Sequence, residues 1–458
     1  MTVPAPDAPA LPAAAAPASA LFTDLYELTM LQAYVENGLT DPATFSLFVR
    51  HLPERRNLLL ACGLDDVLAY LETVRFTDDS LAYLASLGRF GDRFLGWLRD
   101  FRFTGDVHAV PEGTPVFANE PILEITAPLA EAQLAETFVV NQIHLQTTLA
   151  SKAVRVVTAA RGRPVVDFGA RRIHGTDAAL KAARAFHIAG VAATSNVLAG
   201  RVYGLPVTGT MAHSFVQACG SELDAFRAFV RLYPDTVLLV DTYDTLRGVS
   251  RVCALARELG AAFRVRAVRL DSGDLLELSR RARTMLDAAG LGRVGIFASS
   301  SLDEDAIDDL LNRGAPIDGF GVGTKMGVSE DAPSLDVVYK LCAYAGEGRL
   351  KLSTGKPVLP GRKQVFRIEA DGRAVGDVIG RADETPEGRP LLEPVMLGGR
   401  RTAAGTRTAE DARTCAADEL SRLPGPVRDL APATPPYRVR ISDPLRAYRD
   451  DVIRKVSG

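Results

Sequence analysis

The sequence predicts an α/β protein whose middle part forms a closed or nearly closed barrel of parallel strands. Short runs of β-branched or apolar residues occur seven times there, and helical patterns separate most of them. The spacing between successive runs fits one strand plus one helix, which is typical of parallel βαβ units. Seven consecutive units favour a barrel over an open sheet, and a doubly wound sheet is the alternative. The runs end at or just before Asp167, Thr194, Thr208, Asp241, Asp271, Ser299 and Val322.

The N-terminal part divides into a tail and a first domain. Residues 1–20 are rich in Ala and Pro, a composition that cannot bury a core, so we expect a disordered tail. Residues 21–150 are expected to form an N-terminal α/β domain. Its patterns predict helices near 24–34, 58–71 and 131–161, a strand at 43–49, and short strands between the Gly and Pro residues of 104–127.

Residues 151–345 hold the predicted barrel, and residues 346–458 follow it as a C-terminal segment. The barrel strands are predicted at 164–166, 191–193, 205–207, 236–240, 265–270, 294–297 and 317–320, with helices at 177–186, 223–232, 245–259, 274–289 and 303–313. The C-terminal segment is rich in Gly, Pro and charge and ends in a predicted helix at 443–455. It forms either a small domain of its own or packs on the N-terminal domain, and we expect the second.

The charge balance argues against nucleic acid and membrane partners. Lys and Arg number 53 against 56 Asp and Glu, so the net charge is −3 and no global positive field exists. The Ala-rich start lacks the basic residues of a secretory or transit peptide, and no apolar stretch is long enough to cross a bilayer. The five cysteines include no C-x-x-C pair. We therefore expect a reduced, cytoplasmic protein without a structural metal.

Glycines at the end of the last predicted strand mark a candidate phosphate site. The segment Gly321-Val322-Gly323-Thr324 lets backbone N–H groups approach an anion, and barrel phosphate sites recur after the last strands. The segment is one residue too long for the G-x-G-x-x-G fingerprint, and the chain has no P-loop. A plain tight turn is the alternative.

Acidic residues follow two neighbouring strands of the predicted barrel. Asp271 and Asp274 come after one strand, close to Arg269, and Asp241 and Asp244 come after the preceding strand. Two carboxylates at adjacent strand ends suit ribose hydroxyls or Mg²⁺, because both prefer oxygen acceptors. Any one of them could instead serve only as a helix N-cap.

His213 is the histidine that lies just past a predicted strand end. It follows a Gly-Thr turn, and a lone histidine is more often structural than catalytic. Asp241 on the adjacent strand could hydrogen-bond one ring nitrogen and leave the other as an oriented nucleophile. At another strand end, Phe168 could stack on an aromatic heterocycle while Arg171 holds an anion; the alternative is a core Phe with a surface Arg.

Together, these segments resemble those of the nicotinate phosphoribosyltransferase family. The matching segments occur in the same order as in the family from residue 21 to about 365, and the match is less close from 370 to 458. It comprises Thr23–Met30, Asp167–Arg172, Ser195–Gly200, Gly209–Phe215, Asp241–Thr245, Leu270–Asp274 and Gly321–Thr324. The resemblance implies a type II phosphoribosyltransferase fold, an incomplete α/β barrel beside an N-terminal α/β domain. It also implies a homodimer in which each subunit's N-terminal segment completes the other subunit's active site.

The resemblance further assigns roles to residues of this chain. The implied substrate-binding residues are Tyr26, Phe168, Arg171, Ser195, Thr210, Arg269, Gly323 and Thr324, and the implied catalytic residues are His213, Asp241 and Asp271. Nicotinate would stack between Phe168 and the partner subunit's Tyr26, in a pocket lined by Arg171, Ser195 and Thr210. The ribosyl group would meet Arg269 and Asp271.

The implied reaction joins nicotinate to 5-phosphoribosyl 1-pyrophosphate as the first step of NAD salvage from nicotinic acid. Gly323 and Thr324 would hold the 5′-phosphate, and Asp241 would orient His213, which ATP would phosphorylate. The site must neutralise the charge of the departing pyrophosphate, for which Mg²⁺ and cationic side chains are suited. The sequence does not identify the residues that bind Mg²⁺. A phosphohistidine would couple ATP hydrolysis to substrate binding.

Three other functions deserve comparison. A nicotinamide phosphoribosyltransferase is the nearest alternative, but at position 195 such enzymes carry an Asp that accepts from the amide, whereas Ser195 does not repel a carboxylate. A quinolinate enzyme lacks the ATP-coupled histidine and needs a more basic pocket. A catalytically silent nucleotide-binding barrel would not need His213, Asp241, Arg269 and Asp271 together.

Overall fold

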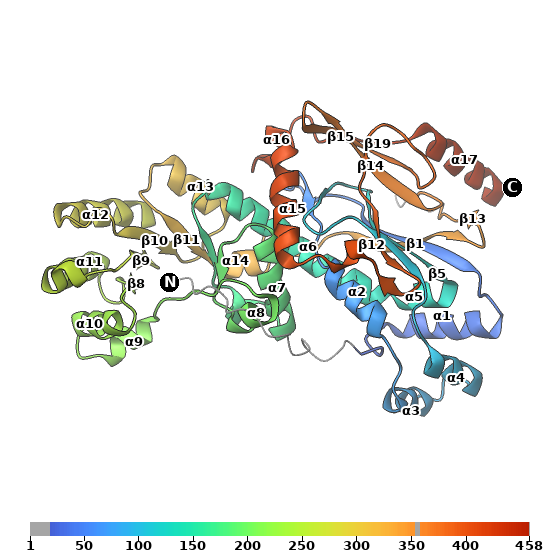
Figure 1. Ribbon diagram of the computed structural model, residues 1–458, viewed down its shortest axis with the longest axis horizontal. Helices are drawn as coiled ribbons and strands as arrows, with labels where there is room; N and C mark the ends of the chain where they lie inside the picture. The colour runs from blue at the N-terminus through green and yellow to red at the C-terminus, as the bar shows by residue number, and fades with distance from the viewer. Residues whose placement is uncertain (1–18, 353–357, 458) are drawn as a thin grey trace. The chain divides into compact units, whose positions relative to one another are not determined.

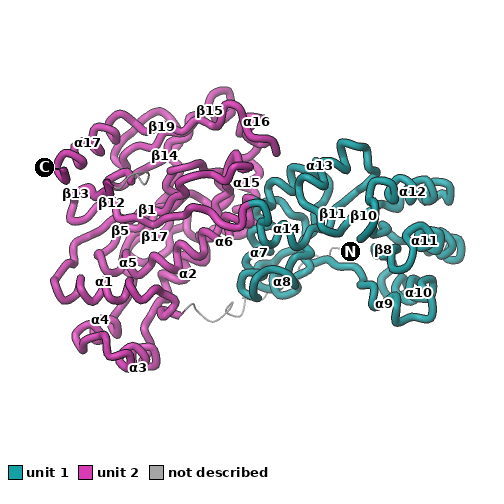
Figure 2. The backbone as a smooth tube through the Cα atoms, turned by 180° about the vertical axis from the view of Figure 1, so that it is seen from behind, with its two compact units in different colours: residues 1–10, 152–331 teal, residues 11–151, 332–458 magenta. Residues whose placement is uncertain are grey.

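The computed structural model describes residues 19–352 and 358–457, which form two compact units (Figure 2). Residues 152–331 make up the first unit, and those up to 151 together with those from 332 onward make up the second. Of the Ala/Pro-rich tail, residues 1–18 lie outside the described residues, and Ala20 is buried in the second unit's core. The first unit ends before the expected barrel boundary at 345, because residues 337–344 pair with the second unit's sheet.

The first unit is built on a six-stranded parallel sheet in the order β7-β6-β11-β10-β9-β8. Thr194 of β7 also forms a parallel bridge with Val207, which adds a seventh segment. The last strand, β11, pairs with the first, β6, whereas within the described part of the chain no pairing joins Val207 to β8. The sheet is therefore an incomplete α/β barrel, as predicted. Its strands are β6 Val165–Asp167, β7 Ala193–Thr194, β8 Val237–Leu239, β9 Ala267–Leu270, β10 Gly295–Ser299 and β11 Gly319–Val322.

Helices follow these strands and pack around the sheet (Figure 1). Asp244, Asp274 and Asp303 each accept backbone N–H groups in the first turn of the following helix, at 2.8–3.1 Å. These three carboxylates serve as N-caps, which leaves Asp241 and Asp271 for other partners. The helices are α7 Thr176–Ile188, α8 Val197–Tyr203, α9 His213–Ala218, α10 Glu222–Leu232, α11 Thr245–Leu259, α12 Leu275–Ala288, α13 Glu304–Asn312 and α14 Thr324–Gly327.

The second unit contains an antiparallel seven-stranded sheet in the order β13-β12-β1-β5-β3-β17-β18 and a four-stranded sheet in the order β16-β14-β15-β19. The larger sheet is made of β1 Pro42–Val49, β3 Asp106–Ala109, β5 Pro121–Pro128, β12 Val337–Tyr344, β13 Glu347–Gly348, β17 Glu393–Leu397 and β18 Arg400–Arg401. The smaller is made of β14 Lys363–Ala370, β15 Arg373–Arg381, β16 Arg389–Pro390 and β19 Val439–Ile441. Chain segments far apart in sequence therefore share both sheets.

The helices of the second unit differ in part from the prediction. The helix expected at 58–71 begins only at Leu64, because β2 (Leu59–Leu60) pairs with β4 (Pro115–Val116). The helix expected at 131–161 is two helices, the second of which continues into the first unit. The helices are α1 Leu25–Glu36, α2 Leu64–Thr73, α3 Asp78–Ser86, α4 Asp92–Asp100, α5 Leu129–Leu134, α6 Glu136–Ala159, α15 Ala409–Arg422, α16 Gly425–Arg428 and α17 Asp443–Ser457.

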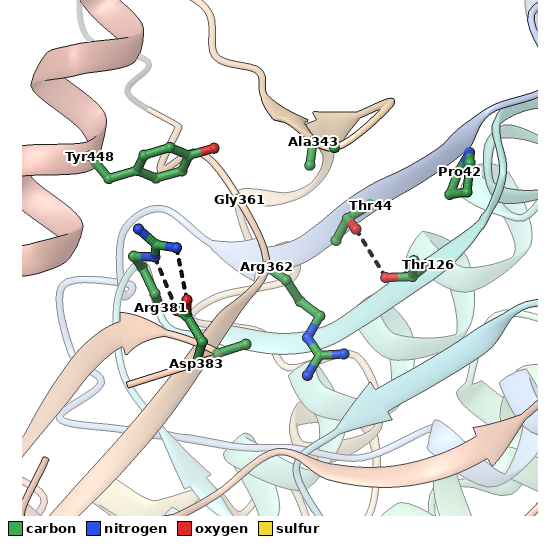
Figure 3. Close-up of a pocket in the computed structure, with 11 residues that line it drawn as sticks. Pro42, Thr44, Thr126, Ala343, Gly361, Arg362, Arg381, Asp383 and Tyr448 are labelled. Carbon is green, nitrogen blue, oxygen red and sulfur yellow. Dashed lines mark hydrogen bonds and ion pairs between the residues drawn. The ribbon is translucent and has the colours of Figure 1, made fainter. Parts of the chain in front are cut away.

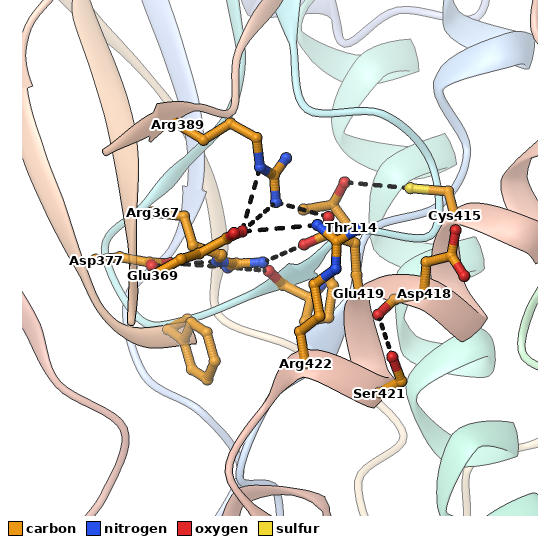
Figure 4. Close-up of polar contacts among 12 residues, drawn as sticks. Thr114, Arg367, Glu369, Asp377, Arg389, Cys415, Asp418, Glu419, Ser421 and Arg422 are labelled. Carbon is orange, nitrogen blue, oxygen red and sulfur yellow. Dashed lines mark hydrogen bonds and ion pairs between the residues drawn. The ribbon is translucent and has the colours of Figure 1, made fainter. Parts of the chain in front are cut away.

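A cluster of buried charged side chains connects strands β14 and β15 with helix α15 in the second unit (Figure 4). Arg367 of β14, 1% exposed, donates to both carboxylate oxygens of Asp377 on β15, at 3.1 and 2.8 Å, and to Glu419 on α15 at 2.8 Å. Arg389 also donates to Glu419, at 2.6 Å, from a half-exposed position. Because every charge in the cluster has a partner, the burial of Arg367 is tolerated.

No helix within the described ranges is both long and apolar enough to span a membrane. This finding agrees with the absence of long apolar stretches in the sequence.

Candidate active site

Side chains from several strand ends meet at the carboxyl edge of the half-barrel in the first unit. Arg269 of β9 is central among them. Its Nη1 donates to the Thr210 hydroxyl, its Nη2 lies 3.9 Å from Asp271 Oδ2, and its Cζ lies 5.8 Å from the centre of the Phe168 ring. Burial lowers the pKa of Arg269, while Asp271 and Asp241 oppose that shift. The buried Nε has no hydrogen-bond partner among the described residues, so one donor remains for a ligand.

Phe168 is held by the backbone on both sides. Its N–H donates to the Val322 carbonyl at 2.8 Å, and a Cβ added to Gly321 would lie 2.6 Å from the ring. Gly321 therefore makes room for the Phe168 ring. The glycine segment of β11 therefore also positions the Phe168 side chain, in addition to forming a turn.

Asp167 stabilises the loop that carries Phe168 through hydrogen bonds. Its carboxylate accepts from Gly169 N and from the Thr194 hydroxyl, both at 2.7 Å, and its backbone carbonyl accepts from Ser195 N at 2.9 Å. Burial raises the pKa of Asp167, and these two hydrogen bonds lower it. Asp167 is a positioning residue for both Phe168 and Ser195. The sequence places it at a strand end but gives no sign of this role.

His213 begins helix α9, in the chain segment between the Val207 bridge and β8. Its Nδ1 lies 3.1 Å from the Thr242 hydroxyl, and its Nε2 lies 3.6 Å from Asp271 Oδ2. The side chain is 40% exposed, so a ligand can reach the ring. Thr242 was not among the residues that the sequence singled out, although it directly follows Asp241.

The expected hydrogen bond from a ring nitrogen of His213 to Asp241 is not present. Asp241 Oδ2 instead accepts from Asp271 N at 2.9 Å and from the Ser272 hydroxyl at 2.6 Å. The carboxylate therefore braces the neighbouring strand end, which turns it away from the ring. The other oxygen, Asp241 Oδ1, is buried without a hydrogen-bond partner among the described residues.

Asp271 connects the two halves of this cluster. Its Oδ1 accepts from the Ser299 hydroxyl at 2.5 Å, while its Oδ2 faces His213 and Arg269 at 3.6 and 3.9 Å. Ser299 ends β10 and is buried. The sequence located Ser299 at a strand end but did not name it as a site residue.

The Gly323-Thr324 turn also lies at this edge of the sheet. Arg172 donates to the Thr324 hydroxyl at 3.1 Å, and its neighbour Arg171 is exposed and close enough to Arg269 to lower its pKa. A Cβ on Gly323 would lie 3.3 Å from the Phe168 carbonyl. The Arg172 guanidinium and the Thr324 hydroxyl therefore lie together at a backbone turn that follows the last strand, a suitable setting for a phosphate.

Ser195 and Tyr26 complete the predicted set. Ser195 is partly buried beside the Phe168 loop, and its hydroxyl has no hydrogen-bond partner among the described residues. Tyr26 belongs to α1 of the other unit, where it is 47% exposed. Partial burial and the charge of Glu136 raise the pKa of Tyr26, which keeps the phenol protonated. Ten of the eleven predicted site residues thus belong to the first unit, and Tyr26 does not.

A divalent cation fits the carboxylates of this edge. Mg²⁺ is usually held by one or two carboxylates together with substrate phosphates. Asp241 Oδ1 is an unpartnered buried oxygen, and Asp271 Oδ2 has only the two distant neighbours given above. Across residues 19–352 and 358–457, there is no group of three or more His, Cys, Asp or Glu side chains that could hold a metal ion.

The chain matches two family models along most of its length. Residues 21–144 match the nicotinate phosphoribosyltransferase (NAPRTase) N-terminal domain, and residues 164–367 match the NAPRTase family. These two segments include all the residues discussed at this site.

Named relatives agree with these models. The chain is 58% identical to nicotinate phosphoribosyltransferase pncB2 of Mycobacterium tuberculosis, over 93% of this chain and 92% of the relative. It is 43% identical to the nicotinate phosphoribosyltransferase of Bacillus subtilis, over 80% of this chain and 76% of that protein. The crystal structure of human nicotinic acid phosphoribosyltransferase superposes with a TM-score of 0.83 at 29% identity, covering 94% of this chain and 99% of the human one.

Proposed function

The chain belongs to the nicotinate phosphoribosyltransferase family, and we propose that it makes nicotinate mononucleotide from nicotinate and 5-phosphoribosyl 1-pyrophosphate with ATP as co-substrate. It is an enzyme of NAD biosynthesis, and the nicotinamide alternative is not favoured. The observation that carries the detailed proposal is the cluster of Arg269, Asp271 and His213 at one edge of the half-barrel.

The pyridine ring of nicotinate stacks on Phe168 in this proposal. The ring face of Phe168 already lies near the Arg269 guanidinium, so a flat ligand there gains both stacking and a cationic neighbour. Arg171, Ser195 and Thr210 supply donors for the nicotinate carboxylate. A neutral Ser195 hydroxyl donates to a carboxylate, whereas an Asp at that place would repel it.

The phosphoribosyl group lies between Asp271 and the Gly323-Thr324 turn. Asp271 accepts from ribose hydroxyls, and the turn with Arg172 receives the 5′-phosphate. The nicotinate ring nitrogen attacks C1 of the ribose, the C1–O bond breaks, and pyrophosphate leaves with the electron pair. When bound, Mg²⁺ neutralises charge on the phosphate oxygens, and Asp241 and Asp271 are the residues that would hold it.

His213 accepts the γ-phosphoryl group of ATP at Nε2. With Nδ1–H donating to the Thr242 hydroxyl, the lone pair is on Nε2, which lies 3.6 Å from Asp271 Oδ2 in a side chain that is 40% exposed. The bond between Nε2 and the γ-phosphorus forms as the bond from that phosphorus to the β–γ bridging oxygen of ATP breaks, and ADP leaves with the bridging oxygen. The phosphohistidine then adds negative charge beside Asp271 and Arg269, and water later releases it as phosphate.

We further propose that two copies form a homodimer with shared active sites. Phe22, Leu25 and Tyr26 are large apolar or aromatic side chains near the start of α1, and each is 46–47% exposed. A partner chain that covers this surface would bring Tyr26 to the pyridine ring opposite Phe168. The five cysteines are free thiols, which agrees with the proposed cytoplasmic location.

The proposed reaction is tested with purified protein, 5-phosphoribosyl 1-pyrophosphate, Mg²⁺ and ATP. Nicotinate, nicotinamide and quinolinate are supplied in separate reactions, and mononucleotide and ADP are followed by chromatography. We expect nicotinate mononucleotide together with ADP from nicotinate. Product from nicotinamide alone would overturn the assignment of Ser195, and nicotinate mononucleotide without ADP would overturn the ATP coupling.

A further inference from the structure

A cavity of about 420 Å³ lies in the second unit, lined by no residue of 152–331. Its walls come from β1 and β5 of the seven-stranded sheet, from the ends of β14 and β15, and from helix α17 (Figure 3). The volume falls within the range of small-molecule sites. The catalytic cluster described above therefore does not account for this cavity.

The cavity carries one uncompensated positive charge. Arg381 forms a two-pronged pair with Asp383, at 3.0 and 2.8 Å, and its Cζ lies 4.8 Å from the centre of the Tyr448 ring. Arg362 is exposed, and its guanidinium group has no hydrogen bond or ion pair with any described residue; only its backbone carbonyl is paired, with Ala382 N. The fork of a free guanidinium group suits the oxygens of a phosphate.

Two hydroxyl groups face the same space. Thr44 and Thr126 lie opposite each other on β1 and β5, with their hydroxyl oxygens 3.0 Å apart. In Figure 3 the Arg362 side chain starts between this pair and the Arg381–Asp383 pair and extends away from Tyr448. A hydroxyl pair has one proton to spare, so one threonine can donate to an anion while the other donates to its neighbour.

Glycines fix the aromatic wall of the cavity. A Cβ on Gly361 would lie 2.9 Å from Cε1 of Tyr448, and a Cβ on Gly348 would lie 2.6 Å from its hydroxyl oxygen. Gly361 also has a φ of +79°, which other residues rarely adopt. Tyr448 therefore packs directly on backbone, and the wall is in place before any ligand binds.

We propose that this cavity binds a small phosphate ester, with Arg362 as its anchor and the Thr44 and Thr126 hydroxyls as further donors. The space exceeds that needed for inorganic phosphate, and the organic part of the ester lies against Tyr448 and Gly361. Such a site goes beyond the proposed reaction, because it gives the enzyme a second place at which a phosphorylated metabolite binds.

The experiment measures binding of ribose 5-phosphate by equilibrium dialysis to an Arg269→Gln enzyme, in which the first unit's site is weakened. Arg362→Gln is added in one variant and Arg373→Gln, which changes an exposed arginine of the same β14–β15 hairpin, in a matched control. We expect Arg362→Gln to raise the Kd about tenfold, or about 1.4 kcal/mol, and Arg373→Gln to leave it within about twofold. Thermal unfolding checks that each variant folds.

Several outcomes would overturn this proposal. Equal affinity in the Arg362→Gln and Arg373→Gln variants would remove Arg362 from the site, and an undetectable interaction at millimolar ester in the Arg269→Gln enzyme would remove the site itself. Ribose binding as tightly as ribose 5-phosphate would exclude phosphate recognition. Inorganic phosphate binding as tightly as the ester would reduce the site to a free-phosphate site. Thr126→Val is the second variant, and it should weaken the ester without altering ribose.

Discussion

The Nδ1 atom of His213 lies 3.1 Å from the hydroxyl oxygen of Thr242, so a threonine holds the ring that we propose to be phosphorylated. Asp241, one residue earlier, turns its carboxylate toward Asp271 N and Ser272. The Thr242 hydroxyl can orient the ring through one hydrogen bond and adds no charge of its own. The ring is therefore positioned by one residue while the neighbouring acid remains available for another partner.

Thr242→Val should slow phosphorylation of His213 without abolishing it. The variant keeps the shape of the side chain and removes the hydrogen bond, which contributes about 1 kcal/mol and so changes the rate roughly five- to tenfold. The measurement is the rate at which label from γ-labelled ATP appears on the protein. Thr284→Val on the exposed face of α12 is the control and should behave as wild type. An unchanged rate in Thr242→Val would show that the ring needs no orientation from this residue.

His213→Ala should abolish ATP-stimulated synthesis of nicotinate mononucleotide while the fold stays intact. The histidine is partly exposed at the start of a short helix, so its loss leaves no cavity in the core. Product is measured with and without ATP, and circular dichroism monitors the fold. ATP stimulation that persists in the variant would contradict the phosphohistidine assignment.

Ser195→Asp should weaken nicotinate far more than nicotinamide. A carboxylate at this position repels the carboxylate of nicotinate, and we expect the KM for nicotinate to rise about tenfold or more. Ser195→Ala is the control that removes the hydroxyl without adding charge. Steady-state kinetics with each base give the comparison, and equal losses for both bases would show that Ser195 is remote from the nicotinate carboxylate.

Arg367→Leu should destabilise the second unit strongly. It leaves the carboxylates of Asp377 and Glu419 without their buried cation, which typically costs about 3–5 kcal/mol. Arg389→Leu removes a half-exposed partner of Glu419 and should cost about 1 kcal/mol or less. The midpoint of urea unfolding compares the two variants. Similar shifts would mean that the burial of Arg367 adds nothing to its ion pairs.

Glu27→Gln should change how stability depends on pH. Burial raises the pKa of Glu27 from 4.5 to about 7, while hydrogen bonds from Thr137 and Thr23 partly oppose the shift. Because the folded pKa is the higher one, the native protein is favoured at low pH, and this contribution is lost as the pH rises from about 4.5 through about 7. Glutamine does not titrate. The free energy of unfolding of Glu27→Gln relative to wild type should therefore increase over this range and level off above it, and a constant difference would contradict the shift.

The sequence predicts the half-barrel well because each strand end is marked locally. Asp167, Asp241, Asp271 and Ser299 all stand where a buried apolar run stops, and the structure places them at one edge. Which oxygen faces which donor is not a local property. His213 hydrogen-bonds Thr242 and not Asp241, because the Asp241 carboxylate accepts from Ser272 on another loop. The sequence pattern does not predict which of these hydrogen bonds forms.

The second unit is harder to predict for a different reason. The strands β14 and β15 carry charged residues among their apolar ones, several of them buried, and the turn between them contains Gly372, so the sequence resembles that of loops. The strands also pair with distant segments, as β1 does with β12. Short apolar runs whose partners lie hundreds of residues away leave no periodic signal in one sequence.

The pairing of Val49 with Val337 also bears on how the chain is made. About 290 residues must leave the ribosome between the two, which at 5–20 residues per second takes roughly 15–60 s. During that interval β1 is synthesised but lacks β12 beside it, while the first unit, a continuous segment, is completed. The open edge of β1 then presents unpaired N–H and C=O groups to other nascent chains. We expect aggregation during expression, and relief by chaperones, to depend on the protection of this strand.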